Sequence, residues 1–138
     1  MSGKVFLDTN IVVYLYSGDE PEKRAVALAL IERNNPVVST QVLSELANTL
    51  SRKFGLSYDV VAQAVAEVRD ACTVSPVMPD TIAQALALAQ KYQYSYYDSL
   101  ILAAALSAGC DTLATEDMQH GQVIEDALTI RNPFVQQS

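Results

Sequence analysis

The sequence has few residues of the kinds that form disulfides or bind zinc, with two cysteines and one histidine among 138 residues. Cys72 and Cys110 belong to no CxxC motif and have no histidine beside them, so we expect buried thiols in a reducing compartment. No apolar stretch is long enough to span a bilayer, and no charged segment precedes an apolar signal core. We therefore expect a cytoplasmic protein without membrane contact.

Positive charge is also scarce, because nine lysines and arginines stand against 16 acidic residues and leave a net charge of −7. A protein that binds the phosphate backbone directly is normally basic. The acidity argues against a simple nucleic-acid binder of that kind. It counts much less against a metal-dependent one, since divalent ions would bring compensating charge, and it leaves room for a basic protein partner.

Apolar segments of strand length alternate with segments of helical periodicity. Half of the residues are hydrophobic, which is enough for one domain over residues 1–138 with a substantial core. We expect helices that begin near residues 9, 21, 40, 58, 79 and 96, and strands at residues 4–7, 37–39, 73–77, 111–115 and 128–130. This alternation predicts the α/β class, a three-layer α/β/α sandwich with a mostly parallel central sheet.

Four acidic residues stand at the edges of these segments, namely Asp8, Glu45, Asp98 and Asp117. Asp8 and Asp117 follow expected strands, whereas Glu45 and Asp98 lie in the early turns of expected helices. Ligands of open parallel sheets bind outside the carboxyl ends of the strands, so we expect all four at one rim. Each acid alone also fits an ordinary structural role, such as a helix cap for Asp8, and the hypothesis depends on their shared placement.

Carboxylates that converge repel one another, by roughly 4 kcal/mol for two unit charges about 4 Å apart at an effective dielectric of 20. Protonation, basic partners or a metal must therefore neutralise such a cluster. An all-oxygen site suits Mg²⁺ or Mn²⁺ rather than zinc, which prefers cysteine and histidine. The sequence thus indicates metal-assisted chemistry at phosphate.

Four segments carry a resemblance that extends over the chain: FLDTNI at residues 6–11, STQVLSE at 39–45, YDSLILAAA at 97–105 and LATEDMQHG at 113–121. In this order and at these separations they are similar to segments of the PIN-domain nucleases, in particular the VapC-like toxins of bacterial and archaeal toxin–antitoxin modules. One such segment would be weak evidence, whereas four in order are specific.

The resemblance implies one PIN-like nuclease domain over residues 1–138, a Mg²⁺- or Mn²⁺-dependent endoribonuclease that hydrolyses RNA phosphodiester bonds by a metal-activated water. The catalytic, metal-binding residues would be the acidic quartet, Asp8, Glu45, Asp98 and Asp117. Asn10 and Thr115 would orient the quartet or bound water by hydrogen bonds. Glu116 adjoins Asp117 and is an alternative to it, although Asp117 occupies the family's Thr-x-Asp position.

The resemblance also implies a homodimer and, for the toxin branch, inhibition by a small antitoxin protein, with transfer or ribosomal RNA as candidate substrates. The alternative is a housekeeping PIN-domain RNA-processing nuclease without an antitoxin. A phosphoacceptor signalling domain would need a lysine after a late strand, and none follows the fourth expected strand. A catalytically silent binding module would be favoured only if the quartet failed to bind metal.

Overall fold

Short apolar strands form the centre of the fold in the computed structural model, which describes residues 3–33 and 35–135. Within those residues, a six-stranded sheet has the order β3-β2-β1-β4-β6-β5. Neighbouring strands are parallel, except that β5 runs antiparallel to β6. The strand bounds are β1 Lys4–Leu7, β2 Asn35–Ser39, β3 Thr73–Ser75, β4 Thr112–Ala114, β5 Val123–Ile124 and β6 Leu128–Arg131.

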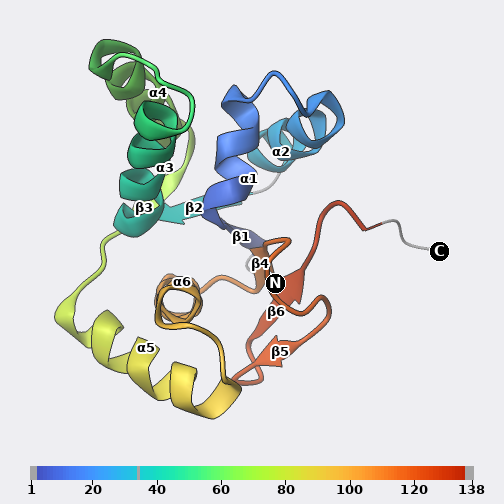
Figure 1. The fold of residues 1–138 in the computed structure, drawn as a ribbon. Coiled ribbons are helices and arrows are strands. Elements are labelled where there is room, and N and C mark those ends of the chain that lie inside the picture. Colours follow the sequence, from blue (N-terminus) through green and yellow to red (C-terminus); the bar gives the residue numbers. More distant parts are fainter. Residues whose placement is uncertain (1–2, 34, 136–138) are drawn as a thin grey trace.

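Helices connect the parallel strands and cover both faces of the sheet (Figure 1). Helices α1 to α4 lie on one side, and α5 and α6 lie on the other (Figure 1). The predicted three-layer α/β/α sandwich with a mostly parallel sheet is therefore confirmed. The helix bounds are α1 Thr9–Val13, the 3₁₀ helix η1 Tyr14–Tyr16, α2 Pro21–Arg33, α3 Thr40–Arg52, α4 Tyr58–Ala71, α5 Pro79–Tyr92 and α6 Tyr96–Ser107.

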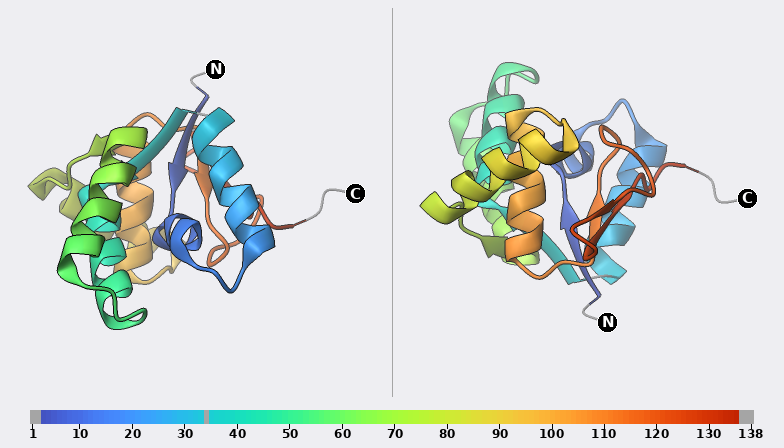
Figure 2. Two further views of the ribbon diagram at one scale, coloured as in Figure 1. Left: turned by 90° about the horizontal axis from the view of Figure 1, so that it is seen from above. Right: turned by 90° about the horizontal axis from the view of Figure 1, so that it is seen from below.

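The core lies between these layers, with β1 at its centre and helices on either side (Figure 2). Phe6 and Leu7 of β1 are fully buried, and the consecutive residues 99–105 of α6 are all buried. Helix α6 is apolar around most of its circumference because it lies between the sheet and α5 and is covered from both sides. No helix in the described part of the chain is long and apolar enough to cross a membrane.

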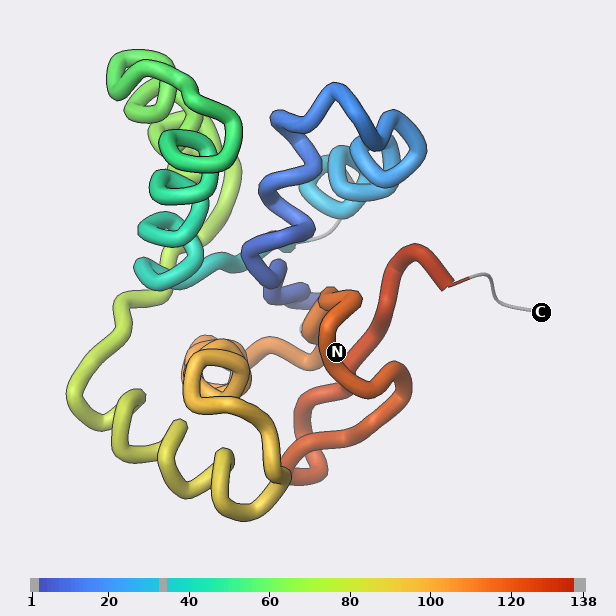
Figure 3. The backbone as a smooth tube through the Cα atoms, in the orientation of Figure 1, coloured from blue at the N-terminus to red at the C-terminus, as the bar shows by residue number. Residues whose placement is uncertain are grey.

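Strands β1, β2 and β4 end at the same edge of the sheet. Leu7 pairs with Ala114 across β1 and β4, and the backbone N–H of Asp8 donates to the Ala114 carbonyl at 3.0 Å. The residues that directly follow β1 and β4 are therefore neighbours. Figure 3 shows the chain leaving β1 for α1 with the orange β4 segment beside it. The fold thus brings residues about a hundred positions apart to one rim.

Several strand ends differ from the sequence-based expectation by one or two residues, as where β2 begins at Asn35 and not at residue 37. Two differences are larger. The helix expected to begin near residue 9 is α-helical only to Val13 and then tightens into η1, as the ends of helices often do. The two-residue strand β5 was not expected. It pairs with β6 through a turn in which Glu125 and Asp126 both have positive φ, 52° and 55°.

Candidate active site

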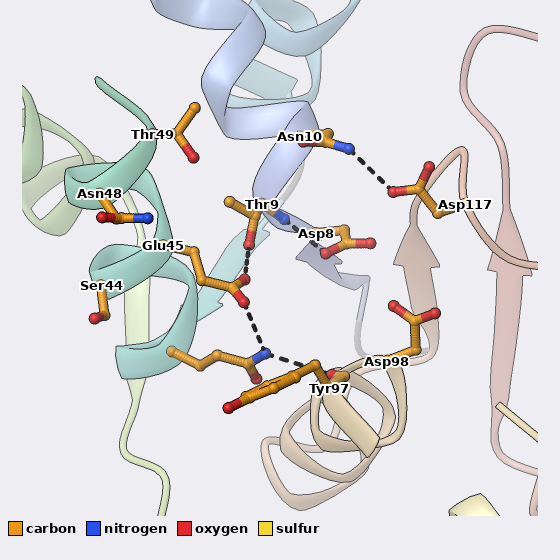
Figure 4. Close-up of a pocket in the computed structure, with 11 residues that line it drawn as sticks. Asp8, Thr9, Asn10, Ser44, Glu45, Asn48, Thr49, Tyr97, Asp98 and Asp117 are labelled. Carbon is orange, nitrogen blue, oxygen red and sulfur yellow. Dashed lines mark hydrogen bonds between the residues drawn. The ribbon is translucent and has the colours of Figure 1, made fainter. Parts of the chain in front are cut away.

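An open pocket of about 700 Å³ lies at the rim of the sheet where β1, β2 and β4 end. All four members of the acidic quartet line it (Figure 4). They come from four separate segments of the chain, and the structure brings every one of them together. The remaining lining residues are uncharged, namely Thr9, Asn10, Gln41, Ser44, Asn48, Thr49 and Tyr97.

Asp8 is the most buried member of the quartet, with 7% of its surface exposed. It caps α1, since its Oδ1 accepts from the backbone N–H of Thr9 at 2.7 Å, and its Oδ2 accepts from the Thr115 hydroxyl at 2.7 Å. Burial raises the pKa of Asp8 from 3.8 to about 6; the two hydrogen bonds oppose the rise, and the charges of Asp117 and Asp98 add to it. Asp8 is therefore both a helix cap and a wall of the pocket.

Asp117 lies across the pocket from Glu45 (Figure 4). Its Oδ2 accepts from the side-chain amide of Asn10 at 3.0 Å, and its backbone N–H donates to the Thr115 hydroxyl oxygen at 3.1 Å. The same hydroxyl donates to Asp8, so Thr115 links the two acids that follow β1 and β4. Asn10 and Thr115 therefore both hydrogen-bond members of the quartet.

Glu45 is held by neutral donors on α1 and α3. Its Oε1 accepts from the Thr9 hydroxyl at 2.6 Å, and its Oε2 accepts from the Gln41 amide at 3.4 Å. The Gln41 amide also donates to the Tyr97 carbonyl at 3.4 Å, while the Gln41 Oε1 is buried with no hydrogen-bond partner among the described residues. A buried acceptor oxygen and an uncompensated carboxylate thus lie side by side on this wall.

Asp98 lies in the first turn of α6, where the Ser95 hydroxyl oxygen accepts from the Asp98 backbone N–H at 3.2 Å. Burial raises the pKa of Asp98. A hydrogen bond with the Ser95 side chain opposes the rise, and the charges of Asp117 and Glu45 contribute to it. The charges of neighbouring quartet members therefore disfavour ionisation of Asp8 and Asp98.

The donor set of the pocket suits a hard divalent cation. Carboxylate, hydroxyl and amide oxygens line it, without a thiol or an imidazole, and Mg²⁺ prefers oxygen ligands. Among the described residues, the ion pairs lie outside the quartet, at Lys23–Glu116, Arg69–Asp70 and Lys91–Glu125. In that part of the chain, no ion pair with a lysine or arginine offsets the charge of the quartet.

The carboxylates surround the pocket and do not converge on one point. Within residues 3–33 and 35–135, no three acidic, histidine or cysteine side chains stand close enough together to hold an ion by themselves. Mg²⁺ keeps several water ligands and usually binds one or two carboxylates, so the wide spacing is compatible with it.

Glu116, which the sequence left as an alternative to Asp117, is not among the residues that line the pocket. Its carboxylate accepts from the Tyr14 hydroxyl and from the Lys23 ammonium, the latter at 2.9 Å, and 18% of its side chain is exposed. The two adjacent acids therefore occupy different environments, with Asp117 facing the quartet.

Of the neutral lining residues, Asn10 was predicted from the sequence and the others were missed. Gln41, Asn48 and Thr49 lie three or four positions from Glu45 on α3, and this spacing places them on the same helical side. Helical spacing was therefore an available signal for them. No local signal existed for Thr9, whose hydrogen bond reaches Glu45 across 36 positions of the sequence.

Comparison with known proteins identifies the same family as the resemblance in the sequence. Residues 5–124 match the PIN-domain family. Among solved structures, the chain is similar to the Sarcin-Ricin loop cleaving toxin VapC20 of Mycobacterium tuberculosis, with 24% identity, a TM-score of 0.66, and coverage of 82% of this chain and 91% of that chain.

Two further structures show the same fold. A toxin–antitoxin complex from Klebsiella pneumoniae matches with 21% identity, a TM-score of 0.70, and coverage of 94% of this chain and 98% of that chain. VapBC-1 from nontypeable Haemophilus influenzae matches with 20% identity, a TM-score of 0.61, and coverage of 83% and 87%. No curated protein matches the sequence.

Proposed function

This chain belongs to the PIN-domain family, and from that premise we propose that it is a divalent-metal-dependent endoribonuclease that hydrolyses RNA phosphodiester bonds. One observation carries the proposal. Four carboxylates from distant segments line one pocket, and no ion pair among the described residues offsets them. Because uncompensated like charges around one pocket repel one another, such a pocket is expected where a cation binds.

The quartet would hold Mg²⁺ or Mn²⁺. When bound, such an ion stabilises negative charge on the phosphate and lowers the pKa of the attacking water. The chain's own residues prepare the pocket for that chemistry. Thr115 fixes Asp8 and the backbone of Asp117, and Thr9 fixes Glu45 on the facing wall. Burial of Asp8 also limits its access to bulk water.

Neutral polar groups on the pocket wall are suited to contact RNA. Ser44 and Asn48 are exposed on α3, and Tyr97 keeps 64% of its surface exposed next to Asp98. Hydroxyl and amide groups donate to phosphate oxygens, and an exposed aromatic ring stacks on an unpaired base. These groups contact RNA without adding negative charge. We therefore propose unpaired segments of transfer or ribosomal RNA as the substrate class, and the description of the M. tuberculosis relative supports RNA.

A toxin role requires a partner that blocks the pocket. The similar structures from K. pneumoniae and H. influenzae are described as a toxin–antitoxin complex and as VapBC-1, which supports a small antitoxin as the partner of this chain. The net charge of −7 favours a basic segment on that partner, because complementary charge steers association.

Helix α5 presents an apolar stripe that supports a homodimer. The stripe consists of three exposed apolar residues at intervals of four: Met78 at the N-cap, Ile82 and Leu86. Their exposed fractions are 53%, 41% and 57%. Residues four apart lie on one side of a helix. We propose that this side packs against a second copy of the chain, since exposed apolar patches commonly mark interaction surfaces.

RNA cleavage by purified wild type, Asp98→Asn and Asp80→Asn tests the enzymatic proposal. Transfer and ribosomal RNA are incubated with each protein in Mg²⁺, in Mn²⁺ and in EDTA. Asp80 is the matched control, because it also occupies the first turn of a helix but lies outside the pocket.

We expect discrete metal-dependent products from wild type and from Asp80→Asn, and none from Asp98→Asn, which lacks a metal-binding charge. Cleavage by Asp98→Asn at the wild-type level would contradict the assignment of the site. Absence of cleavage by the wild type on all RNAs would favour a silent binding module.

A further inference from the structure

Two adjacent acids of the loop after β4 are held by side chains one helical turn apart. Asn10 of α1 donates to Asp117 Oδ2 at 3.0 Å, and Tyr14, four residues later, donates its hydroxyl to Glu116 Oε1. Residues at this spacing share one side of a helix. One helical face therefore binds both acids and fixes the direction in which each one points.

Lys23 of α2 completes this arrangement. Its Nζ lies 2.9 Å from Glu116 Oε2 and 3.2 Å from the Tyr14 hydroxyl oxygen. The same Nζ lies 5.0 Å from the centroid of the Tyr14 ring and 5.1 Å from that of Phe134, distances at which a cation is attracted to an aromatic face. The two rings meet edge to face with centroids 5.5 Å apart. Four segments of the chain thus meet around the Lys23 ammonium group.

We propose that Glu116 is a positioning residue, whose bonds to Tyr14 and Lys23 keep Asp117 turned into the acidic pocket and keep the Glu116 carboxylate out of the metal-binding set. This proposal rests on the proposed function, because it assigns Glu116 an indirect part in metal binding. Both oxygens of Glu116 are engaged and 18% of its side chain is exposed, whereas Asp117 is exposed and lines the pocket.

The charge of Lys23 gives this arrangement a second effect. Glu116 would be a fifth carboxylate beside the quartet and would add to its repulsion if its charge were not compensated. The ion pair with Lys23 offsets that charge. It also holds the ammonium group away from the pocket, where it would compete with a metal ion for the carboxylates.

Mn²⁺ affinity, measured by calorimetry on the whole chain, separates positioning from direct ligation. Loss of a group that orients metal ligands typically weakens metal binding 10- to 100-fold, so we expect Glu116→Ala to raise the Kd for Mn²⁺ about tenfold. We expect Glu116→Gln to stay close to wild type, because its amide oxygen can accept from Lys23 and its NH2 group can donate to the Tyr14 hydroxyl oxygen. A direct ligand would behave differently, since both substitutions remove its charge and would weaken binding alike.

The turn between β5 and β6 supplies a matched control. Glu125 accepts from the Lys91 ammonium at 2.5 Å and from the Tyr92 hydroxyl at 2.8 Å, the same three residue types in a cluster outside the pocket. We expect Glu125→Ala to leave the Kd for Mn²⁺ unchanged. Thermal unfolding of every variant establishes that each one is folded.

Each outcome of the calorimetry either supports or refutes the positioning role of Glu116. Wild-type affinity in Glu116→Ala would overturn the positioning role, even if the melting temperature fell. Equal weakening in Glu116→Ala and Glu116→Gln would overturn it in favour of direct ligation. Asp98→Asn provides the reference for loss of a proposed ligand. A wild type that binds no Mn²⁺ would refute the proposed metal site itself, and the positioning role with it.

Discussion

Removal of the Asp8 charge should stabilise the metal-free protein at neutral pH, although it damages the proposed metal site. Asp8 is 7% exposed, and burial raises its pKa from 3.8 to about 6. Below pH 3.8 the carboxyl is protonated in both the folded and the unfolded chain. Between 3.8 and about 6 only the folded chain keeps the proton, so the free energy of unfolding falls as the pH rises. Above about pH 6 Asp8 is ionised in both the folded and the unfolded chain, and the free energy of unfolding falls no further.

The magnitude follows from the difference between the two pKa values, which corresponds to about 3 kcal/mol. Asp8→Asn has no carboxyl to ionise and therefore avoids this cost. Its Oδ1 can still accept from the Thr9 N–H, and its Nδ2 can donate to the Thr115 hydroxyl oxygen. The buried Thr115 hydroxyl then loses the Asp8 oxygen as acceptor for its proton, which offsets part of the gain by about 1 kcal/mol. We expect Asp8→Asn to be more stable than wild type by about 2 kcal/mol at pH 8 in EDTA.

Metal should reverse this order. A ligand at 100 times its Kd stabilises the folded state by about 2.7 kcal/mol, and only the wild type would gain that amount. Urea unfolding of wild type and Asp8→Asn, followed by circular dichroism at pH 4 and pH 8 in EDTA and then with Mn²⁺, measures both effects. Subtracting one protein from the other cancels the remaining titrating groups. A difference that is the same at pH 4 and pH 8 would refute the burial cost assigned to Asp8.

Two further predictions concern the support of the site and the assembly of the chain. Thr115→Val should lower the free energy of unfolding by about 1–3 kcal/mol at pH 8, because it leaves the buried Asp8 carboxylate without its Thr115 donor; unchanged urea unfolding would contradict this. Leu86→Glu should convert a dimer into a monomer in analytical ultracentrifugation, while Gln84→Glu, which adds the same charge elsewhere on α5, should not. A Leu86→Glu protein that remains dimeric would contradict the proposed α5 interface.

The sequence predicts those parts of the fold that local pattern encodes. The apolar run of β1 and the apolar circumference of α6 identify elements covered on two sides, and that coverage is what makes the sandwich three-layered. Strand β5 could not be predicted, because two residues are too short to show a period. Its turn also places Glu125 and Asp126 at positive φ, for which the usual glycine or asparagine signal is missing.

The sequence likewise predicts only part of the candidate site. Asp8 and Asp117 could be placed at one rim because each follows a strand and parallel strands end together. The choice of Asp117 over Glu116 rested on the resemblance, through the Thr-x-Asp position, because no physical pattern in the sequence separates the two acids. In the fold their different environments depend on Tyr14 and Lys23, which lie 102 and 93 positions from Glu116 in the sequence. A linear pattern contains no information on such pairings, which arise only when α1, α2 and the loop after β4 pack together.

The acids of this chain are held in two different ways, and the difference bears on function. Neutral donors hold members of the quartet, with Thr115 on Asp8, Thr9 on Glu45 and Asn10 on Asp117. Lysine holds Glu116 outside the pocket. A neutral donor fixes the direction of a carboxylate without cancelling its charge, whereas a lysine fixes it and neutralises it. If the quartet served only to stabilise the fold, lysines would be expected beside the quartet as well as beside Glu116. Oriented but uncompensated carboxylates instead keep their charge for a ligand from solution, which is what binding of a divalent cation requires.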